Sequence, residues 1–212
     1  MPHPKQVRPH LSQTPELLSE FWSEIAEQTL NWMRPWVTGL SGGLTQGDVR
    51  WFQGGQLNAS ANCIDRHLAH KAHQPAIIWE GDDASQQRTL TFAQLHAEVC
   101  KMSNVLKGLN VSKGDMVGIY LPMIPEAAIA MLACARIGAV HSVIFAGFSP
   151  HALRQRLIAS SCKYLITADS GQRGGKTIPI KDHADEACQD LDIQTLVIKH
   201  SGKPIVFHPS KD

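Results

Sequence analysis

Two cations flank a pair of glycines in the segment 169–176, which reads DSGQRGGK. Arg173 and Lys176 are presented on a backbone with no side-chain bulk between them, because Gly174 and Gly175 lack a Cβ atom. Such a loop can hold a phosphate, since paired cations bind phosphate oxygens. Taken alone, however, the pattern favours the alternative of an exposed basic turn without a ligand, because short basic glycine loops are common.

The segment follows the last of three apolar runs that predict strands. These runs cover 116–121, 139–145 and 164–168, and they lack the polar alternation of a sheet with one face in water. We therefore expect the strands to be buried on both faces. Ligands of open parallel sheets bind beyond the carboxyl ends of the strands, which is where 169–176 begins.

Helix signals separate the three runs. Pro125 suits a first helical turn, and Gly138 suits a helix end. Ser149 predicts an N-cap, with Pro150 at the first helical position and a helix that reaches about Ser161. Strands joined by helices imply right-handed crossovers, so the predicted fold class is α/β with a parallel βαβαβ sheet.

Further elements flank this sheet. The runs 76–79 and 89–92 predict two strands that pair as a hairpin. Thr91 and Gln94 form a capping box, which opens another helix. The run 195–199 predicts a fourth strand at the edge of an incomplete sheet, and such an edge favours self-association.

The N-terminal segment predicts a separate region. A helix should begin at Thr14 and Pro15, because apolar residues then recur at spacings of three and four. The following stretch is rich in Trp and Gly, which predicts an irregular layer whose aromatics serve packing rather than a ligand site. We assign 1–58 to this helical and irregular segment and 59–212 to the sheet domain.

Three histidines lie on a helix predicted from Ser60 to about His73. His67, His70 and His73 recur every three residues, yet no carboxylate or cysteine completes a site. Steps of three also drift around a helix. A solvated face is therefore favoured over a metal site, and no metal ligand is assigned.

Composition excludes several classes of protein. A formal net charge of +1 gives no reason to expect nucleic acid or an anionic membrane as partner. No run reaches about 18 apolar residues, and the first residues lack the apolar core of a signal peptide. The five cysteines never form CxxC, so neither a disulfide framework nor a zinc site is indicated. We expect a cytoplasmic protein.

Longer segments resemble a known family. NCIDRHL (62–68), AIIWEGDD (76–83), the run 120–150 and ITADSGQRGGKTIPIK (166–181) closely resemble the N-terminal part of the AMP-forming acetyl-coenzyme A synthetases, which are adenylate-forming enzymes. The segments follow the family's order and spacing. The resemblance implies a parent protein that is an acetate–CoA ligase, with acetate, ATP and CoA as substrates and Mg²⁺ as cofactor. Such an enzyme forms acetyl-AMP and then transfers the acetyl group to CoA.

The resemblance also implies a CoA site. In the family, the loop that matches 173–176 contacts the nucleotide part of CoA, and a second Arg often stands where this chain has Lys176. Lysine keeps the charge but lacks the bidentate fork of arginine. The implied CoA-binding residues are Arg173, Gly174, Gly175, Lys176, Phe145 and Gly147.

Other parts of the family pattern are missing from the 212 residues. The Thr-, Ser- and Gly-rich phosphate loop, the acetate pocket and the C-terminal lysine do not occur. Adenylation depends on charges positioned around the phosphates, so no catalytic residue is assigned and a truncated chain, inactive alone, is expected. The alternatives are a fragment of a propionate–CoA ligase, or a non-catalytic truncated paralogue that binds a nucleotide or a partner.

Overall fold

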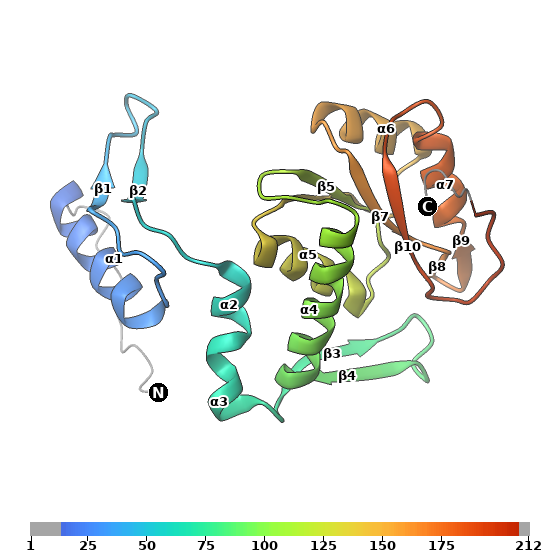
Figure 1. Ribbon diagram of the computed structural model, residues 1–212, viewed down its shortest axis with the longest axis horizontal. Helices are drawn as coiled ribbons and strands as arrows, with labels where there is room; N and C mark the ends of the chain where they lie inside the picture. The colour runs from blue at the N-terminus through green and yellow to red at the C-terminus, as the bar shows by residue number, and fades with distance from the viewer. Residues whose placement is uncertain (1–13, 208–212) are drawn as a thin grey trace. The chain divides into compact units, whose positions relative to one another are not determined.

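The computed structural model describes residues 14–207, in two compact units that meet between Asn58 and Ala59 along the chain (Figure 1). The first unit contains helix α1 (Pro15–Thr29) and the strands β1 (Thr38–Ser41) and β2 (Arg50–Gln53), which pair in antiparallel fashion. The hydroxyl of Thr14 accepts a hydrogen bond from the Leu17 amide at 3.4 Å, so the predicted start of the helix is confirmed.

Aromatic residues form the centre of the first unit. The rings of Trp32, Trp36 and Phe52 lie with their centroids 4.7 to 5.5 Å apart. The Trp32 indole donates a hydrogen bond to the carbonyl of Ala26 at 3.0 Å. These aromatics pack against one another and onto α1. The segment between them forms the β1–β2 hairpin rather than the wholly irregular layer that we predicted.

A four-stranded parallel sheet forms the second unit. Its order is β10–β7–β5–β6, and its strands are β5 (Met116–Ile119), β6 (Val140–Val143), β7 (Tyr164–Ala168) and β10 (Gln194–Ile198). All three strand pairings are parallel. The predicted parallel sheet is therefore confirmed, and the chain enters it at β5, moves to β6, and then crosses to β7 and β10.

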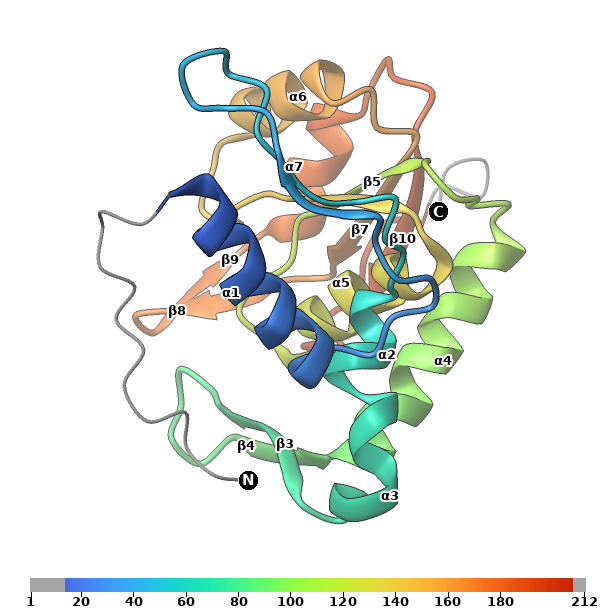
Figure 2. The same ribbon diagram turned by 90° about the vertical axis from the view of Figure 1, so that its left-hand side faces the viewer.

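Helices cover both faces of this sheet. They are α4 (Phe92–Gly108), α5 (Pro125–Ile137), α6 (Pro150–Ala159) and α7 (Ile180–Ala187). Helices α4 and α5 lie on one face, and α6 and α7 lie on the other (Figure 2). The local signals are confirmed: Thr91 and Gln94 form the capping box, Gly138 ends α5 with a φ of 79°, and Ser149 caps α6.

Burial differs between the predicted strands. The core residues of β5 and β7 pack into the helices on both faces. The expectation that 139–145 would be buried on both faces is wrong, because β6 lies at a sheet edge and leaves Val140 47% and Val143 57% exposed. Apolar content does not reveal a strand's position within a sheet. Strand β10 lies at the opposite edge, as predicted, and self-association through it stays a prediction.

Two short hairpins extend from this sheet domain. Strands β3 (Pro75–Glu80) and β4 (Gln87–Thr91) form the predicted antiparallel hairpin. The segment predicted as a loop after β7 contains a second hairpin, made of β8 (Gly171–Arg173) and β9 (Lys176–Ile178). The glycine pair is the turn that joins its strands.

The predicted helix over 60–73 is broken. It consists of α2 (Ala59–Cys63), a 3-10 turn at Asp65–His67 and α3 (Leu68–Lys71). The break accompanies a salt bridge in which the Asp65 carboxylate receives two hydrogen bonds from Arg136 of α5. Within residues 14–207, no His, Cys, Asp and Glu side chains cluster as a metal site would require, and no helix combines the length and apolar character needed to span a membrane.

Candidate functional site

The parallel topology brings two predicted site segments together. Strands β6 and β7 both lie parallel to β5 and beside it, so the loops after them leave the sheet at the same, carboxyl-terminal, end of the strands. Phe145 follows β6, and Arg173 lies in the hairpin after β7. The guanidinium carbon of Arg173 lies 5.3 Å from the centroid of the Phe145 ring. This distance is within the range of a cation–π interaction.

The glycine pair forms a tight turn. Gly174 and Gly175 have φ values of 57° and 72°, and Arg173 pairs directly with Lys176 across the turn. Two successive positive φ values are typical of a type I′ turn, which glycine adopts without strain. Residues paired in this way have side chains on the same face of the hairpin. The turn therefore presents both exposed cations side by side.

A carboxylate binds the amides of this turn. The backbone N–H groups of Gly174 and Gly175 donate to the two oxygens of Asp82 at 2.9 and 2.8 Å. Asp82 lies in the loop between β3 and β4. The hydrogen bond from Gly175, followed by that from Gly174, lowers the pKa of Asp82 below its ordinary value. Phosphate binding in this conformation thus depends on the Arg173 and Lys176 side chains rather than on these amides.

Two aromatic rings and two guanidinium groups form a row beside the turn. Phe145, which is 52% exposed, meets Phe148 edge-on at a centroid distance of 5.6 Å. The guanidinium carbon of Arg156, in α6, lies 4.7 Å from the Phe148 centroid. A Cβ atom on Gly147 would lie 2.4 Å from the Phe145 ring, so only glycine lets the ring approach this backbone. The sequence-based site included Gly147 but missed Arg156.

Tyr120 anchors the loop that carries Phe145. Its side chain is fully buried just after β5, and its hydroxyl lies 3.1 Å from the carbonyl of Ala146 and 2.9 Å from that of Phe148. The Nδ1 atom of His183 lies 3.4 Å from the same oxygen. Because the hydroxyl has one proton to donate to a carbonyl, a His183 tautomer protonated at Nδ1 completes the set as a donor. Burial raises the pKa of Tyr120, so it stays neutral.

Asp169 anchors the start of the segment 169–176. Its buried carboxylate accepts hydrogen bonds from the amides of Ser170, His200, Ser201 and Gly202 at 2.7 to 3.1 Å, and from the Ser201 hydroxyl at 3.1 Å. Burial alone would raise the pKa of Asp169, but the backbone hydrogen bonds outweigh it and lower the pKa. The carboxylate therefore ties the end of β7 to the chain that follows β10.

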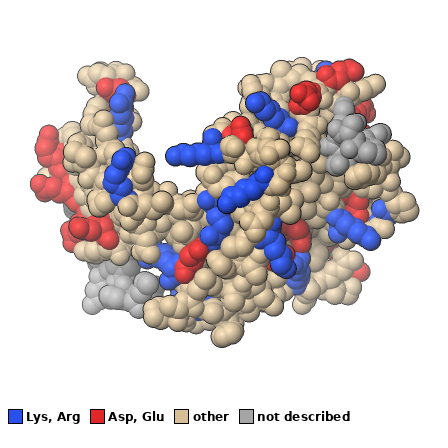
Figure 3. All heavy atoms as spheres, in the orientation of Figure 1, with Lys and Arg blue, Asp and Glu red and all other residues tan. Residues whose placement is uncertain are grey.

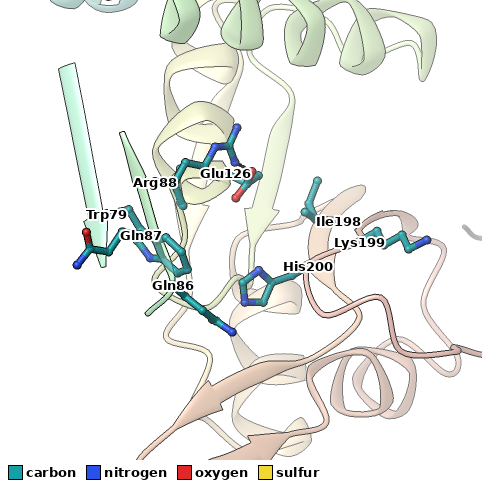
Figure 4. Close-up of a pocket in the computed structure, with 9 residues that line it drawn as sticks. Trp79, Gln86, Gln87, Arg88, Glu126, Ile198, Lys199 and His200 are labelled. Atoms are coloured by element: carbon teal, nitrogen blue, oxygen red, sulfur yellow. Dashed lines mark hydrogen bonds and ion pairs between the residues drawn. The ribbon is translucent and has the colours of Figure 1, made fainter. Parts of the chain in front are cut away.

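A cavity of about 410 Å³ lies between the β3–β4 hairpin, the start of α5 and the end of β10 (Figure 4). Arg88 and Glu126 form an ion pair in its wall, and the Trp79 indole donates to the carbonyl of Met123 at 2.6 Å. None of its lining residues belongs to the predicted site. The lining residues are Trp79, Gln86, Gln87, Arg88, Pro125, Glu126, Ile198, Lys199 and His200.

Comparisons with known proteins identify the family. A sequence profile described as "AMP-binding enzyme" matches residues 64–209, and one described as "Acetyl-coenzyme A synthetase N-terminus" matches residues 12–63. The chain belongs to the AMP-binding enzyme family. The resemblance inferred from the sequence is therefore confirmed.

Individual relatives agree with this assignment. The acetyl-coenzyme A synthetase of Saccharophagus degradans is 52% identical over 195 residues, which is 91% of this chain and 30% of that protein. The acetyl-coenzyme A synthetase 2 of Pseudomonas aeruginosa is 53% identical over 187 residues, or 88% of this chain and 29% of that protein. The chain thus spans about 30% of the length of these curated relatives.

A solved structure supports the fold of this AMP-binding family member. The acetoacetyl-CoA synthetase from Streptomyces lividans superimposes with a TM-score of 0.82 and is 26% identical in sequence. The match covers 90% of this chain and 30% of that chain. The predicted α/β class is therefore confirmed.

Proposed function

We propose that this chain is the N-terminal part of an acetate–CoA ligase, which activates acetate with ATP to acetyl-AMP and transfers the acetyl group to CoA. The observation that carries the proposal is the high identity, across most of the chain, to proteins named acetyl-coenzyme A synthetase. The profile of that enzyme's N-terminus supports it for the first unit. Cytoplasmic location belongs to the same proposal.

Within this enzyme, the residues of this chain bind CoA. Arg173 and Lys176 pair with phosphate groups of its nucleotide part, because both cations are exposed on one face of the hairpin. The Phe145 ring lies against the Arg173 guanidinium, and Gly147 leaves room for that ring. Gly174 and Gly175 contribute by forming the turn. On the face drawn in Figure 3, acidic side chains gather over α1, and several Lys and Arg side chains are dispersed over the sheet domain with acidic groups beside some of them.

ATP and Mg²⁺ would be held mainly by other parts of the enzyme. Among the described residues, no cluster of His, Cys, Asp and Glu fits a metal ion, so we assign no Mg²⁺ ligand and no step through the metal. The ion would enter with its nucleotide as MgATP. The part played by this chain is therefore to bind and orient CoA.

A chimera tests this function. Residues 15–207 replace the matching segment of the Saccharophagus degradans enzyme, and the unsubstituted chimera must catalyse both half-reactions. Arg173→Ala should raise the Michaelis constant for CoA by about 5- to 150-fold, because a phosphate loses charge-assisted hydrogen bonds. Acetate-dependent exchange between ATP and pyrophosphate should be unchanged, since it precedes CoA binding.

A matched substitution controls for general loss of positive charge. Lys107 is an exposed cation in the last turn of α4, outside the proposed site, so Lys107→Ala should leave both measurements unchanged. Equal impairment of exchange and thioester formation by Arg173→Ala would contradict CoA binding by this turn. It would instead indicate a structural role for the basic hairpin.

A further inference from the structure

We infer that Asp82 is a positioning residue of the CoA site, which holds the turn between β8 and β9 so that Arg173 and Lys176 face the ligand. The expected effect on CoA binding rests on the proposed function. The contact between Asp82 and the turn is independent of that function. Asp82 would not touch CoA. It acts through the two glycine amides that its carboxylate binds.

The turn requires support from outside its own hairpin. Strands β8 and β9 have three residues each, and two-stranded hairpins are marginally stable in water. Residues 172–177 are all exposed, and one side-chain pair, Gln172 with Thr177, links the strands at 3.1 Å. Two adjacent glycines also have more conformational freedom to lose than any other pair.

Asp82 supplies this support with both carboxylate oxygens. Oδ1 accepts from Gly174 and Oδ2 accepts from Gly175, so the contact fixes the orientation of the turn as well as its distance. Hydrogen bonds from N–H groups to a carboxylate are stronger than those between neutral groups. The contact joins residues that are 92 and 93 positions apart.

The loop that carries Asp82 is itself held in place. Gly81 donates to the carbonyl of Gln86 at 2.8 Å, and Gln86 donates back to the carbonyl of Asp83 at 2.8 Å. The Trp79 indole donates a hydrogen bond from the same hairpin to the carbonyl of Met123. Met123 follows β5, at the carboxyl end of the strands, where Phe145 also lies. A continuous set of contacts therefore runs from the sheet through Asp82 to the turn.

A second effect of Asp82 opposes the first. Its negative charge lies near two cations that would bind phosphate, so its removal also relieves repulsion of an anionic ligand. Because Asp82 is fully exposed, water and salt screen this repulsion, whereas loss of both hydrogen bonds frees the turn. We therefore expect positioning to dominate.

Asp83 provides the matched control. It is the adjacent residue, it carries the same charge, and its carboxylate accepts from the Ser85 amide at 2.9 Å rather than from the turn. Asp83→Ala therefore removes one negative charge from the same loop but keeps the contact with Gly174 and Gly175. A change that it shares with Asp82→Ala reflects the charge or the fold of this loop rather than the two hydrogen bonds to the turn.

The experiment compares Asp82→Ala, Asp82→Asn and Asp83→Ala in the same chimera. Hydrogen–deuterium exchange is followed in a peptide that covers 171–178, and the Michaelis constant is measured with CoA. Asp82→Ala should increase early exchange in this peptide and raise the Michaelis constant about threefold to tenfold, because two cationic side chains must then be ordered on binding. Asp82→Asn keeps one acceptor oxygen and should be intermediate. Asp83→Ala should change neither value more than about twofold.

The outcomes separate the inference from the proposed function. If Asp82→Ala leaves exchange unchanged, or if Asp83→Ala matches it in both measurements, the inference is wrong. If exchange rises but the Michaelis constant does not, while Arg173→Ala still raises that constant, the inference is wrong and CoA binding stands. If neither Asp82→Ala nor Arg173→Ala affects the Michaelis constant, the proposed function of this turn fails.

Discussion

Asp169 and Asp82 bind backbone N–H groups at the two ends of the segment 169–176. Asp169 does so in a buried position, whereas Asp82 does so on the surface. Asp169 is 6% exposed and accepts five hydrogen bonds at the base of the segment. Asp82 is fully exposed and accepts two at the tip. The chemistry is the same in both places, since a carboxylate fixes a loop through its amides.

Burial determines what each carboxylate does for the protein. The amides around the buried Asp169 carboxylate have limited access to water, so loss of this acceptor should destabilise the fold. Amides at the exposed tip can bind water instead, so loss of Asp82 should change the order of the turn with little effect on global stability. The same type of interaction can therefore serve stability at the base of a loop and ligand positioning at its tip.

The largest effect is expected from Asp169→Ala. The buried amide of Ser170 and the part-buried amides of His200, Ser201 and Gly202 lose their acceptor, and the free energy of unfolding should fall by about 2 to 4 kcal/mol. Urea unfolding of the 212-residue chain measures this change as a lower midpoint at a constant slope. Asp190→Ala, which removes an exposed carboxylate after α7, should leave the midpoint unchanged. A midpoint for Asp169→Ala within error of the unsubstituted chain would mean that Asp169 does not stabilise the fold.

A smaller effect should follow acidification. The pKa of Asp169 lies below its ordinary value of 3.8, so the stabilisation that it provides is present above this value and is lost as the pH falls through the pKa of the folded state. The difference in free energy of unfolding between the unsubstituted chain and Asp169→Asn should therefore stay constant above about pH 5 and shrink as the pH falls below about 4.

Comparing two chains at each pH separates Asp169 from the other carboxylates, which titrate in both. Urea unfolding at several pH values gives the required differences. A difference that stays constant down to about pH 3 would mean that the negative charge of Asp169 does not contribute to the free energy of unfolding.

The smallest effect on stability is expected from Asp82→Ala. Its hydrogen bonds are exposed, so the urea midpoint of the chain should stay within error of the unsubstituted value even though exchange of the turn amides increases. Urea unfolding and amide exchange should be measured side by side for Asp82→Ala and Asp169→Ala. If Asp82→Ala lowered the midpoint as far as Asp169→Ala, the tip would belong to the stabilising core of the segment.

Signals between near neighbours in the sequence determined most of the helices and the sheet. The Thr91 capping box, the left-handed end at Gly138 and the Ser149 cap each depend on groups within about four residues, so they act the same way wherever the element lies. Apolar runs separated by helices determined the parallel sheet in the same manner. The resemblance to a family predicted which residues after β7 bind a ligand. It predicted no contact between these residues.

Only the tertiary structure decided which distant residues meet. Composition could not place β6 at an edge, since an apolar run reads the same in the centre of a sheet. The pairing of Arg173 with Phe145 depends on the strand order around β5. The contact between Asp82 and the glycine turn joins residues more than 90 positions apart. No local pattern encodes such a contact, because it exists only after the fold brings two hairpins together beyond the carboxyl ends of the parallel strands.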